Sequence, residues 1–268
     1  MRNACAKLLV IGAVCIGSGL TGPSALAGSI SPAKARSGAP IGPSAKLSAA
    51  FDPKRLGAAT TISFALSITA TDGGAPPPLS NVDVSFPGDL GFATSGLGLA
   101  ACDPTALEVE GPAACPPNSQ MGRGSALSEV SFGPRVVPER VDLRLFAGPS
   151  LDGYLHLVIL ASGRTPVIAH VVLKAVLLPG HIEITVPPVP ALPGGPDVVF
   201  TSLRATLGGA LTYYRRSHGR SIPYRPQGIG LPDRCPRAGW RLASKLAFLD
   251  GQRSLAETVI PCPARRRR

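Results

Sequence analysis

The sequence predicts an all-β protein, an antiparallel β-sandwich with about ten strands. Three observations support this class. The 268 residues include 31 glycines and 29 prolines, and residues that disfavour helix interiors at this frequency restrict the chain to short elements and turns. Several segments alternate apolar and polar residues, as strands with one buried and one solvated face do. Turn residues separate these segments roughly every 8 to 15 residues, a spacing typical of sandwiches.

Residues 1–27 have the composition of a secretory signal peptide. Arg2 and Lys7 form a positive n-region, Leu8–Leu20 is an apolar h-region, and an Ala-Leu-Ala sequence ending at Ala27 fits the cleavage pattern. As a helix, the h-region would span about 20 Å, which is short of the roughly 30 Å hydrocarbon core of a bilayer. We therefore expect a secreted, extracytoplasmic protein that is cleaved after Ala27 and has no transmembrane segment afterwards.

The mature chain divides by composition into a linker, a folded region and a tail. Residues 28–45 are small, contain proline and show no pattern, which predicts a flexible linker. The sandwich is expected over residues 46–263, with two subdomains meeting near residues 148–153 as the alternative. Residues 264–268 form a basic tail.

The charge of the folded region is only mildly positive. Without the tail and the two cations of the signal peptide, 21 basic side chains face 16 acidic ones, so the formal net charge falls from +11 to +5. This balance does not indicate a dedicated nucleic-acid binder. With 44% hydrophobic and 16% charged residues, the composition also excludes a wholly disordered chain.

Strands are expected wherever the alternation is clear. Ile62, Phe64 and Leu66 share one face of a strand within residues 61–71, and a second strand follows at 82–86. Further strands are expected at 121–132, 136–147, 153–161, 166–178, 181–187, 197–208, 210–216, 239–249 and 253–260.

The mature chain keeps four cysteines, an even number that predicts two disulfides in an oxidising compartment. Four cysteines allow three pairings, and the local sequence favours nearest neighbours: one bond would bracket a short helix and the other would close a hairpin. The competing interpretation is that the four cysteines bind zinc, but they do not form CxxC pairs and no histidine lies at ligand spacing beside them. The expected bonds are Cys102–Cys115 and Cys235–Cys262.

One short helix is expected between Cys102 and Cys115. Asp103 is a suitable N-cap, and Pro104 at the first helical position fits because its missing N–H has no partner there in any case. Gly111 is the expected stop.

The last hairpin turns at Asp250-Gly251. A three-residue loop, residues 249–251, places Trp240 on an apolar face and leaves Arg241, Lys245 and Glu257 together in solvent. A two-residue loop would instead turn Glu257 toward the apolar face, and burying an unpaired carboxylate costs several kcal/mol. The three-residue loop is therefore predicted.

Several short motifs are distributed over most of the mature chain. They are Phe51-Asp52-Pro53, Phe86-Pro87-Gly88, Cys102-Asp103-Pro104, Cys115–Gly122, Leu231–Pro236 and Pro261-Cys262-Pro263. In this order they resemble a group of uncharacterised exported proteins from high-GC actinobacteria. The resemblance implies an extracytoplasmic, disulfide-containing, immunoglobulin-like sandwich, and it implies no activity.

The sequence contains no motif that carries catalysis. No GxSxG elbow occurs, and the nearest segment, Gly148–Asp152, has Asp in place of the second glycine. No calcium loop or phosphate-binding loop is present. His181 and Glu183 could share a strand face as the start of a metal site, but a solvated face is the expected reading. We expect a protein that is not an enzyme and needs no metal or cofactor.

The best candidate for a binding segment lies between residues 213 and 220. Tyrosines next to arginines can stack on sugars or bases and neutralise anions. The competing interpretation is a strand end with a basic loop whose tyrosines cap the core. The candidate residues are Tyr213, Tyr214, Arg215, Arg216, His218 and Arg220.

These observations lead to one function and two alternatives. The first is an exported, non-enzymatic sandwich with a structural, adhesive or envelope-associated role. An alternative is a binding module for an anionic glycan or another polyanion through residues 213–220. The less favoured alternative is a secreted hydrolase whose site assembles from residues far apart in the sequence. Expected partners are an anionic cell-envelope polymer or another surface protein, and no specific nucleic acid.

Overall fold

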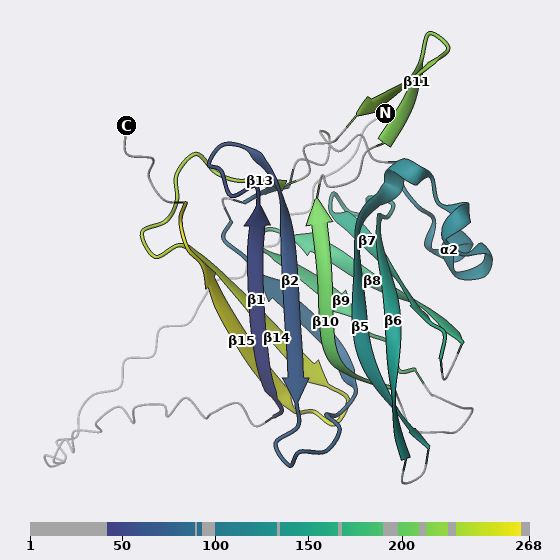
Figure 1. Cartoon of the computed structure of the whole chain (residues 1–268), viewed down its shortest axis with the longest axis vertical. Helices are drawn as coiled ribbons and strands as arrows, with labels where there is room; N and C mark the ends of the chain where they lie inside the picture. The colour runs from purple at the N-terminus through teal and green to yellow at the C-terminus, as the bar shows by residue number, and fades with distance from the viewer. Residues whose placement is uncertain are drawn as a thin grey trace, which may run out of the picture. The chain divides into compact units, whose positions relative to one another are not determined.

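Antiparallel strands dominate the computed structural model (Figure 1). It describes residues 42–88, 90–92, 100–132, 135–165, 168–189, 198–208, 213–224 and 229–263. The expected all-β class is confirmed. The predicted signal peptide and basic tail lie outside the described residues, as does most of the predicted linker.

One large sheet contains thirteen of the strands, and each of its hydrogen-bonded pairs is antiparallel. Two short strands, β13 (Ile229–Gly230) and β4 (Gly91–Phe92), extend it beside β2. The order of the longer strands is β15 (Arg253–Ile260), β14 (Trp240–Phe248), β3 (Leu79–Ser85), β9 (His181–Thr185), β8 (Ala169–Leu178), β7 (Leu155–Gly163), β6 (Arg135–Ala147), β5 (Gln120–Phe132), β10 (Val199–Gly208), β2 (Ala59–Thr69) and β1 (Ser44–Asp52).

The sheet is barrel-like, which corrects the expectation of a clear two-sheet sandwich. Its first and last long strands, β1 and β15, lie alongside each other. Where both strands begin, the Ser254 hydroxyl donates a hydrogen bond to the carbonyl oxygen of Pro43. We call this junction the seam. Alternation in a sequence shows which side of a strand is buried, but it does not show whether the strands divide into two sheets or curl around one core.

Most predicted strands are confirmed to within a few residues. Residues 148–153, the alternative subdomain boundary, lie in the connection between the neighbouring strands β6 and β7. Sequence reasoning missed β1, which begins at Ser44 within the predicted linker. It also missed β12 (Arg220–Tyr224), which pairs with β11 (Tyr213–Ser217) in a separate hairpin.

The last hairpin has the predicted register. Phe248 and Gln252 flank a three-residue loop, in which Gly251 adopts a φ of 86°. The Arg241 guanidinium lies 2.8 Å from the Glu257 carboxylate on the solvent side, and Trp240 is fully buried. The predicted three-residue loop, which keeps Glu257 in solvent, is therefore confirmed.

Both predicted disulfides are confirmed, Cys102–Cys115 and Cys235–Cys262. The first brackets α2 (Pro104–Glu110) and two short 3-10 turns, η1 (Pro112–Ala114) and η2 (Pro117–Ser119). The Asp103 carboxylate caps α2 by accepting hydrogen bonds from the backbone N–H groups of Thr105 and Ala106.

Helix α2 covers part of the outer side of the sheet. Leu107 is fully buried and joins a small cluster with the outward-facing side chains of Phe146, Val158 and Leu160. The main core lies on the other side of the strands, inside the curl. Within the described ranges, no helix is long and apolar enough to cross a membrane.

Candidate functional site

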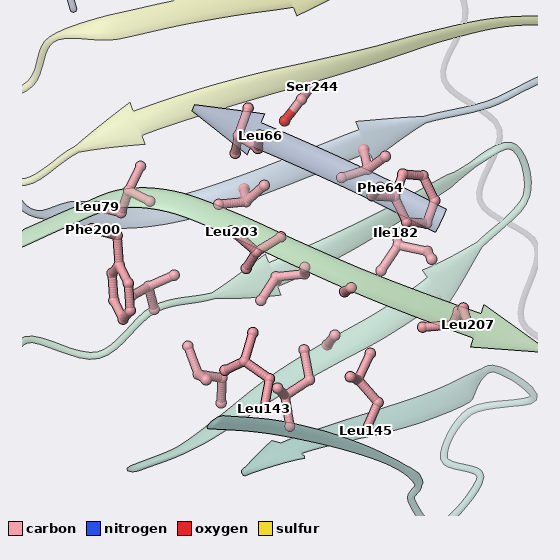
Figure 2. A pocket seen from close by; sticks show the side chains of 18 of the residues that line it. Phe64, Leu66, Leu79, Leu143, Leu145, Ile182, Phe200, Leu203, Leu207 and Ser244 are labelled. Carbon is pink, nitrogen blue, oxygen red and sulfur yellow. The ribbon is translucent and has the colours of Figure 1, made fainter. Parts of the chain in front are cut away.

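The interior of the sheet is not completely filled. A cavity of about 150 Å³ lies among side chains from β1, β2, β3, β6, β7, β8, β9, β10 and β14 (Figure 2). Nearly all of its lining is aliphatic or aromatic. The labelled side chains in Figure 2 are Phe64, Leu66, Leu79, Leu143, Leu145, Ile182, Phe200, Leu203, Leu207 and Ser244.

Strand alternation creates this lining. Side chains two residues apart on one strand share a face, so Leu203, Ala205 and Leu207 all point inward from β10. Phe64 opposite Ala205 is also inward, yet both side chains are only half-buried. Both residues line the interior cavity and also a groove on the outer side of the sheet.

Such a cavity is costly for a folded protein. Unfilled core volume destabilises by about 24 cal/mol per Å³, so about 150 Å³ corresponds to about 3.6 kcal/mol. Total stabilities of natural domains are only about 5–15 kcal/mol. An engineered apolar cavity of about this volume stays dry and binds benzene. The space therefore has the size and chemistry of a binding site for a small apolar molecule.

Ser244 is one of two serines in the otherwise apolar lining. It lies on β14 at an inward position, between Leu242 and Leu246, and is 1% exposed. Its neighbours across the sheet are Val84 and Ala256. Its hydroxyl oxygen has no hydrogen-bond partner among the residues that the structure describes. Ser202 is the other polar residue among the described residues of the lining, and none of these is ionisable.

A second, smaller cavity of about 40 Å³ adjoins the first. The two share Leu173, Val186 and Phe200 in their linings. The smaller cavity is also lined by Glu139, a carboxylate that is 3% exposed, and by Ser128. A buried acid therefore lies beyond the shared wall of the apolar cavity.

The outer side of the sheet carries a shallow groove across β1, β2, β10 and β5. Arg123 and Arg204 are exposed at this groove, and small side chains including Ser63 and Thr206 form its floor. The Ser63 and Thr206 hydroxyls are 3.2 Å apart. Arg123 also lies directly opposite Arg144 on β6. Within the described residues, no carboxylate pairs with these arginines, so the outer groove is a cationic surface.

The predicted binding segment forms the β11–β12 hairpin. Tyr213, Tyr214, Arg215 and Arg216 lie on β11, and Arg220 begins β12. Exposed His218 turns the chain with a φ of 51°, followed by Gly219 at 75°. The side chains of residues 213–217 lie outside the description, so their role in binding stays a prediction.

The histidines do not assemble a site in the described part of the chain. His156, His170 and His181 lie on three different strands, and no group of three His, Cys, Asp or Glu side chains suited to a metal occurs among the described residues. The His170 ring nitrogen Nδ1 is 3.0 Å from the Ser162 hydroxyl. The Glu183 carboxylate accepts a hydrogen bond from Asn81.

Sequence reasoning missed the interior site. The inward series on β14 is Trp240, Leu242, Ser244, Leu246 and Phe248, so a serine interrupts four large apolar residues. Glu139 interrupts the inward series of β6 in the same way. A polar residue at an inward strand position was the sequence signal that could have indicated this interior site.

Comparisons with protein-family models, curated proteins and solved structures found no match.

Proposed function

We propose that the protein is an exported, non-enzymatic binding protein that holds a small apolar molecule inside its sheet. The cavity of about 150 Å³ carries this proposal, because its lining is apolar and its size matches one that accepts benzene. Occupancy by a ligand would offset the cost of the unfilled volume.

Export remains part of the proposal. The first 27 residues have the composition of a cleavable signal peptide ending at Ala27. Two disulfides are compatible with an extracytoplasmic location, because such bonds persist in oxidising compartments. Together these features support a role outside the cytoplasm, either released or associated with the cell envelope.

Titration of the purified protein with benzene tests the proposal, with calorimetry or NMR shifts as the readout. We expect saturable binding. Ala205→Leu adds three carbons at the cavity wall and should weaken benzene binding at least tenfold. Ala243→Leu is the matched control, because Ala243 lies on the outward side of β14 and does not line the cavity. Absence of saturable binding, or equal losses in both variants, would contradict the proposal.

A second candidate function is binding of an anionic envelope polymer on the outside of the sheet. The observation that favours it is the outer groove, where Arg123 and Arg204 accompany hydroxyl groups and have no acidic partner among the described residues. Two arginines and several hydroxyls can receive carboxylate or phosphate groups. The β11–β12 hairpin, with Arg216 and Arg220, is the competing position.

Co-sedimentation with isolated bacterial cell envelopes across a salt series tests this second function. Binding to a polyanion should weaken as salt rises. Loss of binding in an Arg123→Gln/Arg204→Gln variant would assign it to the outer groove, and loss in Arg216→Gln/Arg220→Gln to the hairpin. Arg241→Gln is the control, since Arg241 is an exposed arginine already paired with Glu257. Binding that is insensitive to salt would contradict a polyanion partner.

A further inference from the structure

The hydroxyl of Ser244 is the feature of the cavity that apolar binding does not explain. Its oxygen is buried and has no hydrogen-bond partner among the described residues, and Ser244 belongs to the cavity lining. Figure 2 shows it as the one polar atom among the labelled side chains. A buried hydroxyl without a partner destabilises a protein, whereas an alanine at this position would not carry that cost. A ligand group that reached this hydroxyl would remove that cost.

We propose that Ser244 forms a hydrogen bond with a neutral oxygen atom on the bound molecule. This inference rests on the proposed function and specifies its ligand class. The ligand is a small uncharged compound with an apolar body and one oxygen group, such as an alcohol, phenol, ketone or ester. A hydroxyl side chain can donate to a carbonyl or accept from another hydroxyl, so both kinds of oxygen group satisfy Ser244.

Charge excludes other ligand classes from the cavity. A carboxylate or ammonium group would lose its hydration on entry, and such a loss is large unless an opposite charge compensates for it. The lining holds no ionisable residue that could do so. A pure hydrocarbon can enter, but it leaves the Ser244 hydroxyl without a partner. A neutral oxygenated molecule fits both properties of the site.

The volume limits the part of the ligand that the cavity holds. A cavity of about 150 Å³ accepts a molecule of about the size of benzene, which is roughly six to eight non-hydrogen atoms. Toluene and phenol are therefore suitable probes. They have the same number of non-hydrogen atoms and differ in a methyl group against a hydroxyl group.

Measuring the affinities of toluene and phenol for the unaltered protein and for Ser244→Ala isolates the hydrogen bond to the Ser244 hydroxyl. We expect Ser244→Ala to weaken phenol binding about tenfold, which is the effect of one lost buried hydrogen bond, and to change toluene binding by less than about twofold. Comparing the change in the two affinities removes the different hydration of the free probes. Benzoate, the charged probe, should not bind to either protein.

Ser254→Ala provides the control variant. Ser254 is also a buried serine, on the neighbouring strand β15, but its hydroxyl already donates to Pro43 and does not line the cavity. This variant should leave both affinities within about twofold of the original values. It should lower Tm, because a hydrogen bond is lost, whereas Ser244→Ala should raise Tm by about 2–4 °C in the absence of ligand.

The outcomes separate this inference from the proposed function. If neither toluene nor phenol binds the unaltered protein, both proposals fail. If both probes bind and Ser244→Ala changes the two affinities equally, the cavity binds ligands but the hydrogen bond to Ser244 is refuted. A lower Tm for Ser244→Ala together with unchanged phenol affinity would assign the serine a structural role and also overturn the inference.

Discussion

The ring of Phe51 meets the indole of Trp240 edge to face, with ring centroids 5.4 Å apart and an interplanar angle of 83°. Both side chains are buried, and they come from strands β1 and β14 that share no hydrogen-bonded ladder. Phe51 stands near the end of β1, and Trp240 begins β14. The pair therefore links two separate parts of the sheet through side-chain packing alone.

Replacement of Phe51 should measure this link. Phe51→Ala is expected to lower the free energy of unfolding by about 3–5 kcal/mol, as large core truncations do. Phe51→Leu keeps an apolar side chain but loses the edge-to-face contact, which is worth about 0.5–1.5 kcal/mol beyond its area, so it should cost less. Trp240 is the single tryptophan, so urea unfolding followed by its fluorescence reports directly on this region. A Phe51→Leu variant as stable as the unaltered protein would show that the ring contact adds nothing.

Reduction of the disulfides should destabilise the fold measurably. The bonded cysteines are 13 and 27 residues apart. Loop-closure entropy predicts losses of about 3 kcal/mol for Cys102–Cys115 and about 3.6 kcal/mol for Cys235–Cys262. Thermal unfolding of the two single-pair variants, Cys102→Ser/Cys115→Ser and Cys235→Ser/Cys262→Ser, checks these values. A Tm that does not fall in either variant would contradict the expectation.

The cap of α2 offers a local test. Asp103→Ala removes the acceptor for two backbone N–H groups and should lower stability by about 1 kcal/mol. Asp103→Asn keeps a side-chain oxygen and is the matched control, with a loss well below that of alanine. Chemical denaturation of the two variants measures the difference. Indistinguishable midpoints for them would mean that the Asp103 cap does not stabilise α2.

The contact between β5 and β10 requires a glycine at position 124. A Cβ atom there would overlap the carbonyl oxygen of Arg204, which belongs to the paired strand. Gly124→Ala should therefore destabilise by about 1–3 kcal/mol, as overpacking does. Gly88→Ala is the control, since nothing lies within 4 Å of its added carbon. Thermal unfolding of the two variants measures the difference in Tm. Similar Tm values for Gly124→Ala and Gly88→Ala would contradict the close approach of the strands.

Local features of this chain could be predicted because they depend on neighbouring residues. The cap at Asp103, the loop at residues 249–251 and the inward series of β2 and β14 all follow from spacing and side-chain chemistry. The position of β1 against β15 depends on segments far apart in the sequence, so alternation could not predict it. Strand β1 pairs with the next strand, β2, and was missed because its first residues lie in a segment with the composition of a linker. The cavity depends on how inward side chains from many strands fit together, although the serine at position 244 was visible as an interruption of its series.

The seam has a consequence for when the protein can fold. It joins Pro43 to Ser254, residues that are 211 positions apart. The apolar lining of the interior cannot be fully shielded from water until the last strand of the chain has been synthesised and has docked. Folds dominated by such distant contacts form slowly. The interior of this protein therefore closes late in folding, and a chain interrupted before β15 would present its apolar lining as an exposed, aggregation-prone surface.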